Sequence, residues 1–265
     1  MKLAILYICT GKYNVFWESF YRSCEQFFFP NEEKHYFVFT DGQIAADTEK
    51  IHRIEQKNLG WPGNTLYRFQ MFWNIKEQLV LFDYIFFFNA NCEFLVPIGA
   101  EFLPSEKEKI VVIRHPGFYN KKPDEVTYDR NPKSLAYIPF GQGLYYICGG
   151  VNGGICEHYI NLINSLREAI IKDDSNGVVA VWHDESHINK YILSHPYKLL
   201  SPAYCYPEGW DIPFEKVIIV RDKNKFGGHD VLRGVNKKNY FLSKVRCIFR
   251  TVIHKIINND QSKIT

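Results

Sequence analysis

The sequence lacks the patterns that define several common kinds of site. Its seven cysteines are odd in number and form neither a CxxC pair nor a zinc-like spacing with histidine, which argues against a disulfide framework and for a reducing compartment. A helix that spans a bilayer needs about 18 consecutive apolar residues, and no apolar run in this sequence is that long. The net charge of +3 is too small to favour a nucleic-acid partner. We therefore expect a cytoplasmic protein that is soluble or peripheral on the inner face of the membrane.

What is present favours an α/β fold. The 265 residues suit one large domain or two small ones. Residues 3–8 form a continuous apolar run, typical of a strand that is covered on both faces rather than of a signal peptide. Apolar residues recur at helical spacing over 14–28, and a second short strand is expected over 36–40. The order strand, helix, strand favours an α/β sheet.

Later elements are read from the same patterns. We expect strands over 84–88, 110–113 and 144–148, a helix that carries Arg68, and helices over 157–172 and 184–193. The glycine pairs at 149–150 and 153–154 are expected to end the third of these strands. Residues 120–143 are polar and contain prolines, so they are expected to be irregular.

The C-terminal part of the chain differs from the rest. Residues 221–236 are basic and contain glycines, which is typical of a mobile segment. In residues 240–257, apolar residues recur at helical spacing and basic residues occupy much of the rest. This pattern predicts a basic amphipathic helix. This helix either packs on the domain or on another copy, or makes peripheral contact with an anionic membrane. We place the domain boundary between 1–236 and 237–265.

Polar clusters follow several of the expected strands. They are Thr10 to Tyr13, Asn89 to Asn91, His115, and the pair Gly149-Gly150. Ligands of open α/β sheets bind beyond the carboxyl ends of the strands. Each cluster alone is typical of a turn, but together they predict one binding cleft.

A second cluster is the run from Trp182 to His187, which concentrates groups capable of acid–base chemistry. His183 and His187 have a spacing found in zinc sites, but the run is not an HExxH motif and no third ligand is evident. A metal role is therefore not favoured. Two interpretations stay open, a catalytic one and a structural one with Asp184 as the helix N-cap.

Several motifs together are similar to one family. In chain order they are Asn89-Ala90-Asn91, His115 to Tyr119, Ala136 to Pro139, the two glycine pairs, and Trp182 to Tyr191. Over about residues 3–235 the chain resembles glycosyltransferase family 6, which includes the histo-blood group A and B transferases and α1,3-galactosyltransferase. It looks like a bacterial member without the stem and membrane anchor of the animal enzymes.

The resemblance implies a GT-A fold, a UDP-sugar donor and retention of configuration at the anomeric carbon. It implies donor-binding roles for Ile8, Cys9, Tyr13, Arg68, Asn89, Ala90, Asn91, Cys148, Gly149, Gly150 and Asp184. It implies acceptor contacts for His115, Thr127 and Trp182. Glu185 matches the carboxylate proposed to act as nucleophile or to stabilise the oxocarbenium-like centre, next to the acceptor.

The donor sugar is expected to be N-acetylgalactosamine, because a glycine at 150 leaves room for an acetamido group. The expected reaction is hexosyl transfer in α1,3 linkage to a galactose of a fucosylated oligosaccharide. Two alternatives stay open, namely a galactose donor, or an inactive module that only binds glycan or nucleotide.

Asn89-Ala90-Asn91 stands where the family has Asp-x-Asp. Two carboxylates would hold a divalent cation there against the leaving diphosphate. Asparagine side chains are neutral and bind such cations weakly, so we expect no metal cofactor. Cations must still stabilise the diphosphate. The candidates are Arg68, Lys223, Lys225 and Arg233.

Overall fold

The computed structural model of the protein describes residues 1–45 and 48–234. The chain divides into two compact units, of which the first is Met1–Asp222 and the second begins at Lys223. The boundary expected after residue 236 and the helix expected over 240–257 lie outside the described residues. Among the residues described, no helix is both long and apolar enough to cross a membrane.

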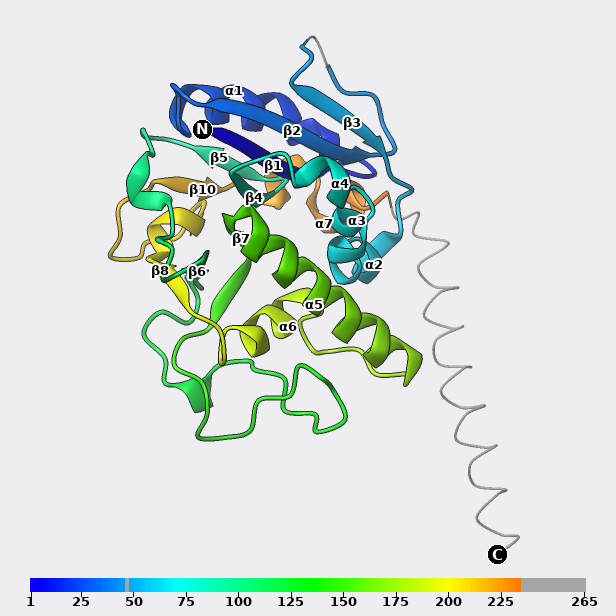
Figure 1. Ribbon diagram of the computed structural model, residues 1–265, viewed down its shortest axis with the longest axis vertical. Coiled ribbons are helices and arrows are strands. Elements are labelled where there is room, and N and C mark those ends of the chain that lie inside the picture. Colours follow the sequence, from blue (N-terminus) through cyan, green and yellow to red (C-terminus); the bar gives the residue numbers. More distant parts are fainter. Residues whose placement is uncertain (46–47, 235–265) are drawn as a thin grey trace, which may run out of the picture. The chain divides into compact units, whose positions relative to one another are not determined.

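The first unit is built on a seven-stranded sheet in the order β3-β2-β1-β4-β7-β6-β8 (Figure 1). Its strands are β1 (Lys2–Ile8), β2 (Glu33–Thr40), β3 (Ile51–Glu55), β4 (Tyr84–Asn89), β6 (Ile110–Arg114), β7 (Ile147–Ile155) and β8 (Tyr197–Leu200). Strand β7 runs antiparallel to both of its neighbours, and the other pairs are parallel. The mixed α/β sheet expected from the sequence is confirmed.

Helices cover both faces of this sheet. The α-helices of the first unit are α1 (Trp17–Phe27), α2 (Gly60–Leu66), α3 (Arg68–Trp73), α4 (Lys76–Leu79), α5 (Cys156–Ser175) and α6 (Asp184–Tyr191). Its 3-10 turns are η1 (Tyr13–Phe16), η2 (Ala100–Phe102), η3 (Pro123–Glu125) and η4 (Pro202–Cys205). Figure 1 shows α3 beside α5, and these two helices are in contact. The region 120–143 is irregular apart from η3, as predicted.

The central strands are apolar along their whole length because both faces are buried. Leu6 of β1 and Phe87 of β4 belong to a core that also includes residues of α3, α5 and α6. The next residue of β1, Tyr7, points to the opposite face, where its ring packs 4.3 Å from the ring of Phe20 in α1. Successive side chains of a strand alternate between faces, so a continuous apolar run supplies two cores at once.

Strand β7 corrects one prediction. The glycine pairs at 149–150 and 153–154 do not end a strand, because β7 continues through both of them to Ile155. A Cβ atom at residue 154 would lie 2.6 Å from the carbonyl oxygen of Lys109, the residue just before the neighbouring strand β6. Glycine in a strand often marks such a close approach of two backbones. In the sequence, a glycine pair inside a strand looks the same as a glycine pair in a turn.

The direction of β7 determines which residues share an edge of the sheet. Because β7 is antiparallel, its first residues lie beside the ends of β4 and β6, where Ile147 pairs with Arg114. Ile8 and Asn89 are also paired at this edge. A smaller sheet contains β5 (Cys92–Phe94), β10 (Ile218–Val220) and β9 (Tyr206–Pro207) in this order, and β5 comes shortly after Asn89 in the chain. The second unit contains η5 (Lys223–Phe226) and α7 (Gly228–Leu232).

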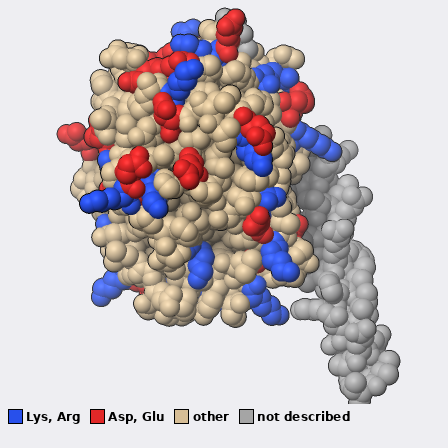
Figure 2. Space-filling model, in the orientation of Figure 1, with Lys and Arg blue, Asp and Glu red and all other residues tan. Residues whose placement is uncertain are grey.

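The surface carries charges of both signs. On the face drawn in Figure 2, the basic and acidic side chains of the described residues are interspersed among uncharged ones. This face therefore offers no extended area of a single sign.

Candidate functional site

The Glu185 carboxylate is held by two hydrogen bonds from β7 and the residues before it. The backbone N–H of Gly149 donates to Oε2 at 2.7 Å, and the hydroxyl of Tyr146 donates to Oε1 at 2.8 Å. Burial raises the pKa of Glu185 to about 7, although both hydrogen bonds lower it. The carboxylate is thus fixed in position and changes charge close to neutral pH, as expected of a group poised for chemistry.

A buried ion pair lies beside Glu185. Arg68, the first residue of α3, places Nε 3.0 Å from Oδ2 of Asp184, and both side chains are almost fully buried. The two groups are close but not aligned for a hydrogen bond, so charge holds them together. Burial raises the pKa of Asp184 to about 6, and the charge of Arg68 opposes this rise. The guanidinium also donates to the carbonyl of Gly149 at 2.8 Å.

Asn189, which was not among the predicted site residues, fixes α6 against β7. Its side-chain amide accepts from the N–H of Ile147 at 2.9 Å and donates to the carbonyls of Ile147, at 3.0 Å, and Glu185, at 2.9 Å. The side chain is fully buried. It lies in the run from Trp182 to Tyr191, and its position one helical turn after Glu185 was the signal that the sequence offered.

The start of α6 corrects a second prediction. His183, and not Asp184, is the N-cap residue of this helix, and it has a left-handed backbone φ of 55°. The ring of His183 packs edge-on against Trp61, whereas Nε2 of His187 lies 3.6 Å from Asp173. The described residues contain no group of three metal-ligating side chains that could hold an ion. These contacts favour structural roles for both histidines.

His115, one of the residues expected to contact an acceptor, is connected to Glu185 through Tyr146, which the sequence did not identify as a site residue. The ring of His115 meets the ring of Tyr146 edge-on at 5.6 Å. Burial lowers the pKa of His115 to about 4, so the imidazole is neutral at neutral pH. Its Nδ1 accepts from the N–H of Gly117 at 3.0 Å, which leaves the proton on Nε2 as a donor for a ligand.

The other two acceptor positions differ in exposure. The hydroxyl of Thr127 is buried and interacts with the hydroxyl of Tyr146. Trp182 is 45% exposed, and its backbone N–H donates to the hydroxyl of Ser186 at 3.0 Å. A half-exposed indole is a suitable surface for packing against a sugar ring.

Asn89 and Gly150 are in direct contact across β4 and β7. A Cβ atom at residue 150 would lie 2.5 Å from Nδ2 of Asn89 and 3.4 Å from Sγ of Cys148. The position that a side chain at residue 150 would take is thus already filled by the amide of Asn89. Cys148 also faces Cys205, with the two sulfur atoms 3.1 Å apart.

The end of β1 lies next to Asn89. Ile8 is its partner in the sheet, and Cys9 is fully buried, with its N–H donating to the carbonyl of Phe39 at 2.9 Å. Tyr13 follows in η1 and is partly exposed.

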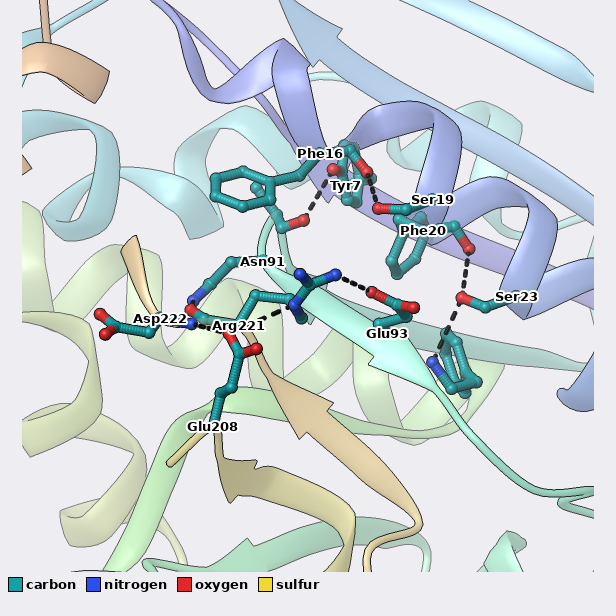
Figure 3. Close-up of polar contacts among 12 residues, drawn as sticks. Tyr7, Phe16, Ser19, Phe20, Ser23, Asn91, Glu93, Glu208, Arg221 and Asp222 are labelled. Carbon is teal, nitrogen blue, oxygen red and sulfur yellow. Dashed lines mark hydrogen bonds and ion pairs between the residues drawn. The ribbon is translucent and has the colours of Figure 1, made fainter. Parts of the chain in front are cut away.

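The remaining residues of the 89–91 motif are bonded within the protein. The hydroxyl of Tyr7 donates to the carbonyl of Ala90 at 2.8 Å. The amide of Asn91 donates to the carbonyl of Arg221 at 2.7 Å, and Figure 3 shows Arg221 between Glu93 and Glu208.

Of the expected cations, Arg68 lies in this region. Lys223 and Lys225 lie in η5 and Arg233 follows α7, all in the second unit. These three basic residues stay predictions for the donor site.

The arrangement as a whole brings β1, β4, β7 and α6 together at one edge of the sheet. The carboxylate of Glu185 is held there by two donors, and the ring of the neutral His115 packs against Tyr146, which provides one of them. Such a site can stabilise a developing positive charge, or attack an electrophilic carbon, beside a polyhydroxylated ligand.

Comparison with known proteins gives one consistent result. The family model described as glycosyltransferase family 6 matches residues 2–233. The histo-blood group ABO system transferase 1 of Rattus norvegicus is 33% identical over 219 residues, which are 78% of this chain and 62% of that protein. The O-antigen biosynthesis glycosyltransferase WbnI of Escherichia coli is 33% identical over 229 residues, or 85% of this chain and 96% of that protein.

A third relative has a more specific name. The globoside alpha-1,3-N-acetylgalactosaminyltransferase 1 of Gallus gallus is 30% identical over 240 residues, which are 84% of this chain and 68% of that protein. The match to the rat transferase covers less than two thirds of that protein.

Proposed function

The chain belongs to glycosyltransferase family 6, and on that basis we propose that it transfers N-acetylgalactosamine from UDP-N-acetylgalactosamine to an oligosaccharide. The proposed product has an α1,3 linkage to a galactose of a fucosylated acceptor, formed with retention of configuration. Membership of the family implies a nucleotide-sugar donor and a glycan acceptor. The mixed α/β sheet flanked by helices is consistent with the GT-A-like fold of such enzymes.

The position of Glu185 carries this proposal. Retention requires either a nucleophile on one face of the sugar or a group that stabilises the oxocarbenium-like centre during attack from the same face. A carboxylate fixed by Gly149 and Tyr146 suits both roles, because it is placed before substrate arrives. Asp184 is paired with Arg68, so Glu185 is the better candidate of the two acidic residues.

The choice of donor sugar rests on two observations. The chicken relative is named for transfer of N-acetylgalactosamine, and residue 150 has no side chain. Because the amide of Asn89 lies against Gly150, both residues determine the room beside the sugar. An acetamido group has a hydrogen-bond donor and an acceptor, and the amide of Asn89 is suited to bond with it.

Catalysis is proposed to proceed without a divalent cation. The residues at the position of the metal site do not fit one, because Asn89 and Asn91 are neutral and Glu93 is paired with Arg221. Arg68 already compensates Asp184, which reduces the charge it can offer to a diphosphate. We therefore assign the leaving group chiefly to Lys223, Lys225 and Arg233.

The test is a transfer assay with EDTA, a panel of UDP-sugars and fucosylated or plain galactosides, in which NMR identifies the product. We expect an α1,3-linked N-acetylgalactosamine product. Transfer of galactose instead would reassign the donor. An absolute requirement for Mn²⁺ would refute the metal-free route, and UDP binding without transfer to any acceptor would indicate a binding module.

A further inference from the structure

Asn91 is bonded twice to a residue far away in the sequence. It is almost fully buried, its side-chain amide donates to the carbonyl of Arg221 at 2.7 Å, and its own carbonyl accepts from the N–H of Arg221 at 2.8 Å. These bonds continue the pairing of β5 with β10, in which Cys92 faces Val220. Figure 3 shows the two residues side by side beyond the end of β10.

The side chain of Arg221 secures the same junction. Its guanidinium is paired with Glu93 on β5 through Nη1 and lies 3.3 Å from Glu208 through Nε. Glu208 also accepts from the N–H of Asp222 at 2.7 Å. Residues 221 and 222 are thus held by backbone hydrogen bonds, by the side-chain amide of Asn91 and by ion pairs of Arg221, and Figure 3 shows these residues together.

The bond to the Arg221 carbonyl determines which residue can stand at 91. A carbonyl oxygen only accepts hydrogen bonds, so its partner must donate. The amide of asparagine donates, whereas an ionised aspartate would place a second acceptor, with a negative charge, against the carbonyl. A buried acceptor that loses its partner costs about 1–3 kcal/mol. A side chain that donates a hydrogen bond is therefore favoured at 91, independently of any metal.

We propose that Asn91 is a positioning residue, which fixes the point where the chain leaves β10 and enters the segment of Lys223 and Lys225. In this account Asn91 does not replace a metal ligand. Its amide sets the starting point of the basic segment, and the contact with UDP is made by that segment. The proposal rests on the proposed function in one respect, the assignment of the basic residues to the diphosphate.

The test uses the Asn91→Asp variant and its dependence on pH. At pH 8 the ionised carboxylate repels the Arg221 carbonyl, and at pH 5.5 a protonated carboxyl can donate to it. The titratable or charged groups that face this junction are Tyr7 on β1, Cys92 and Glu93 on β5, Glu208 after β9, and Arg221 and Asp222 after β10. Comparison with the wild type at the same pH cancels their own titration.

We expect Asn91→Asp to bind UDP at least tenfold more weakly than the wild type at pH 8, and within about threefold of it at pH 5.5. The Michaelis constant for the acceptor should stay unchanged. Asn91→Ala, which adds no charge, should bind UDP several-fold more weakly at both pH values. Asn161→Asp, on the exposed face of α5, introduces the same charge and should match the wild type throughout.

Three outcomes overturn the proposal. The first is wild-type affinity of Asn91→Asp for UDP at pH 8, the second is recovery of its affinity or activity with Mn²⁺, and the third is a melting temperature that does not recover at low pH. The melting temperatures of the four proteins separate this proposal from the proposed function. If the wild type bound no UDP, the proposed function would fail. A melting temperature of Asn91→Asp that recovers at low pH would still establish the bond to Arg221, and one that does not would overturn it.

Discussion

A hydrogen bond connects the backbone of Gly149 to Glu185, because the Gly149 N–H donates to the Glu185 carboxylate at 2.7 Å. The carbonyl of Gly149 accepts from Arg68 at 2.8 Å. A Cβ atom at residue 149 would lie 3.0 Å from Cβ of Glu185. The glycine thus lets strand β7 approach the carboxylate closely, and the position of β7 determines the position of the reactive group.

The first prediction concerns the acidic limb of the pH profile. Burial raises the pKa of Glu185 to about 7, and the hydrogen bond from Tyr146 opposes this rise. If the ionised carboxylate reacts, kcat/KM should fall about tenfold for each pH unit below the pKa of the free enzyme. Tyr146→Phe removes one donor to the carboxylate, so its pKa rises and the limb moves to higher pH.

Tyr128→Phe is the matched control for this measurement. The Tyr128 ring lies 5.5 Å from the ring of Tyr146, but its hydroxyl donates to the backbone carbonyl of Tyr145. The control should lose a hydrogen bond without moving the limb. A limb at the same pH in Tyr146→Phe and the wild type would show that Glu185 does not produce it.

The second prediction concerns the buried ion pair. Asp184 has a pKa that burial raises to about 6, and Arg68 holds it below a still higher value. Arg68→Met leaves an uncompensated charge, which should cost about 3–5 kcal/mol of unfolding free energy at pH 8. The pKa of Asp184 is higher in the folded than in the unfolded state, so it is the ionised form of Asp184 that destabilises the fold. The loss of unfolding free energy should therefore shrink as the pH falls to 5 and Asp184 becomes protonated.

Urea unfolding at both pH values measures this effect. The double variant Arg68→Met, Asp184→Asn should recover part of the loss at pH 8, since it removes the buried charge. An equal loss at pH 5 and pH 8 in the single variant would mean that packing, and not charge, is responsible.

The third prediction concerns the contact between Asn89 and Gly150. A methyl group at residue 150 would meet the Asn89 amide at 2.5 Å, and overpacking of this kind typically costs about 1–3 kcal/mol. Gly150→Ala should therefore raise the KM for the donor about tenfold in the wild-type background. In an Asn89→Ala background the same change should have an effect of about twofold or less. Equal effects in the two backgrounds would contradict a steric coupling.

Local patterns were sufficient to predict much of the fold. The buried strands β1 and β4 and the helices α5 and α6 have strong apolar patterns, because whole faces of these elements are buried. Strands β5, β9 and β10 have only two or three residues each and carry no such pattern. Their pairing depends on contacts between distant parts of the chain.

The site was predicted less completely, for the same reason. The acidic residues and the glycines of β7 were identified by their resemblance to a family. The role of Tyr146 depends on a hydrogen bond across 39 positions, and that of Asn91 on one across 130. Such relationships exist only after folding. The opposite directions of β4 and β7, which bring Asn89 to Gly150, could not be read from either segment.

The most direct test of the central role given to Glu185 is the transfer rate of Glu185→Gln, measured in EDTA beside the wild type. Glutamine can accept from Gly149 and donate to Tyr146, so the fold and the affinity for UDP should be retained. We expect turnover to fall by about 10³-fold or more, corresponding to about 4 kcal/mol. Turnover within tenfold of the wild type, with UDP affinity unchanged, would contradict the assignment of the reaction to Glu185.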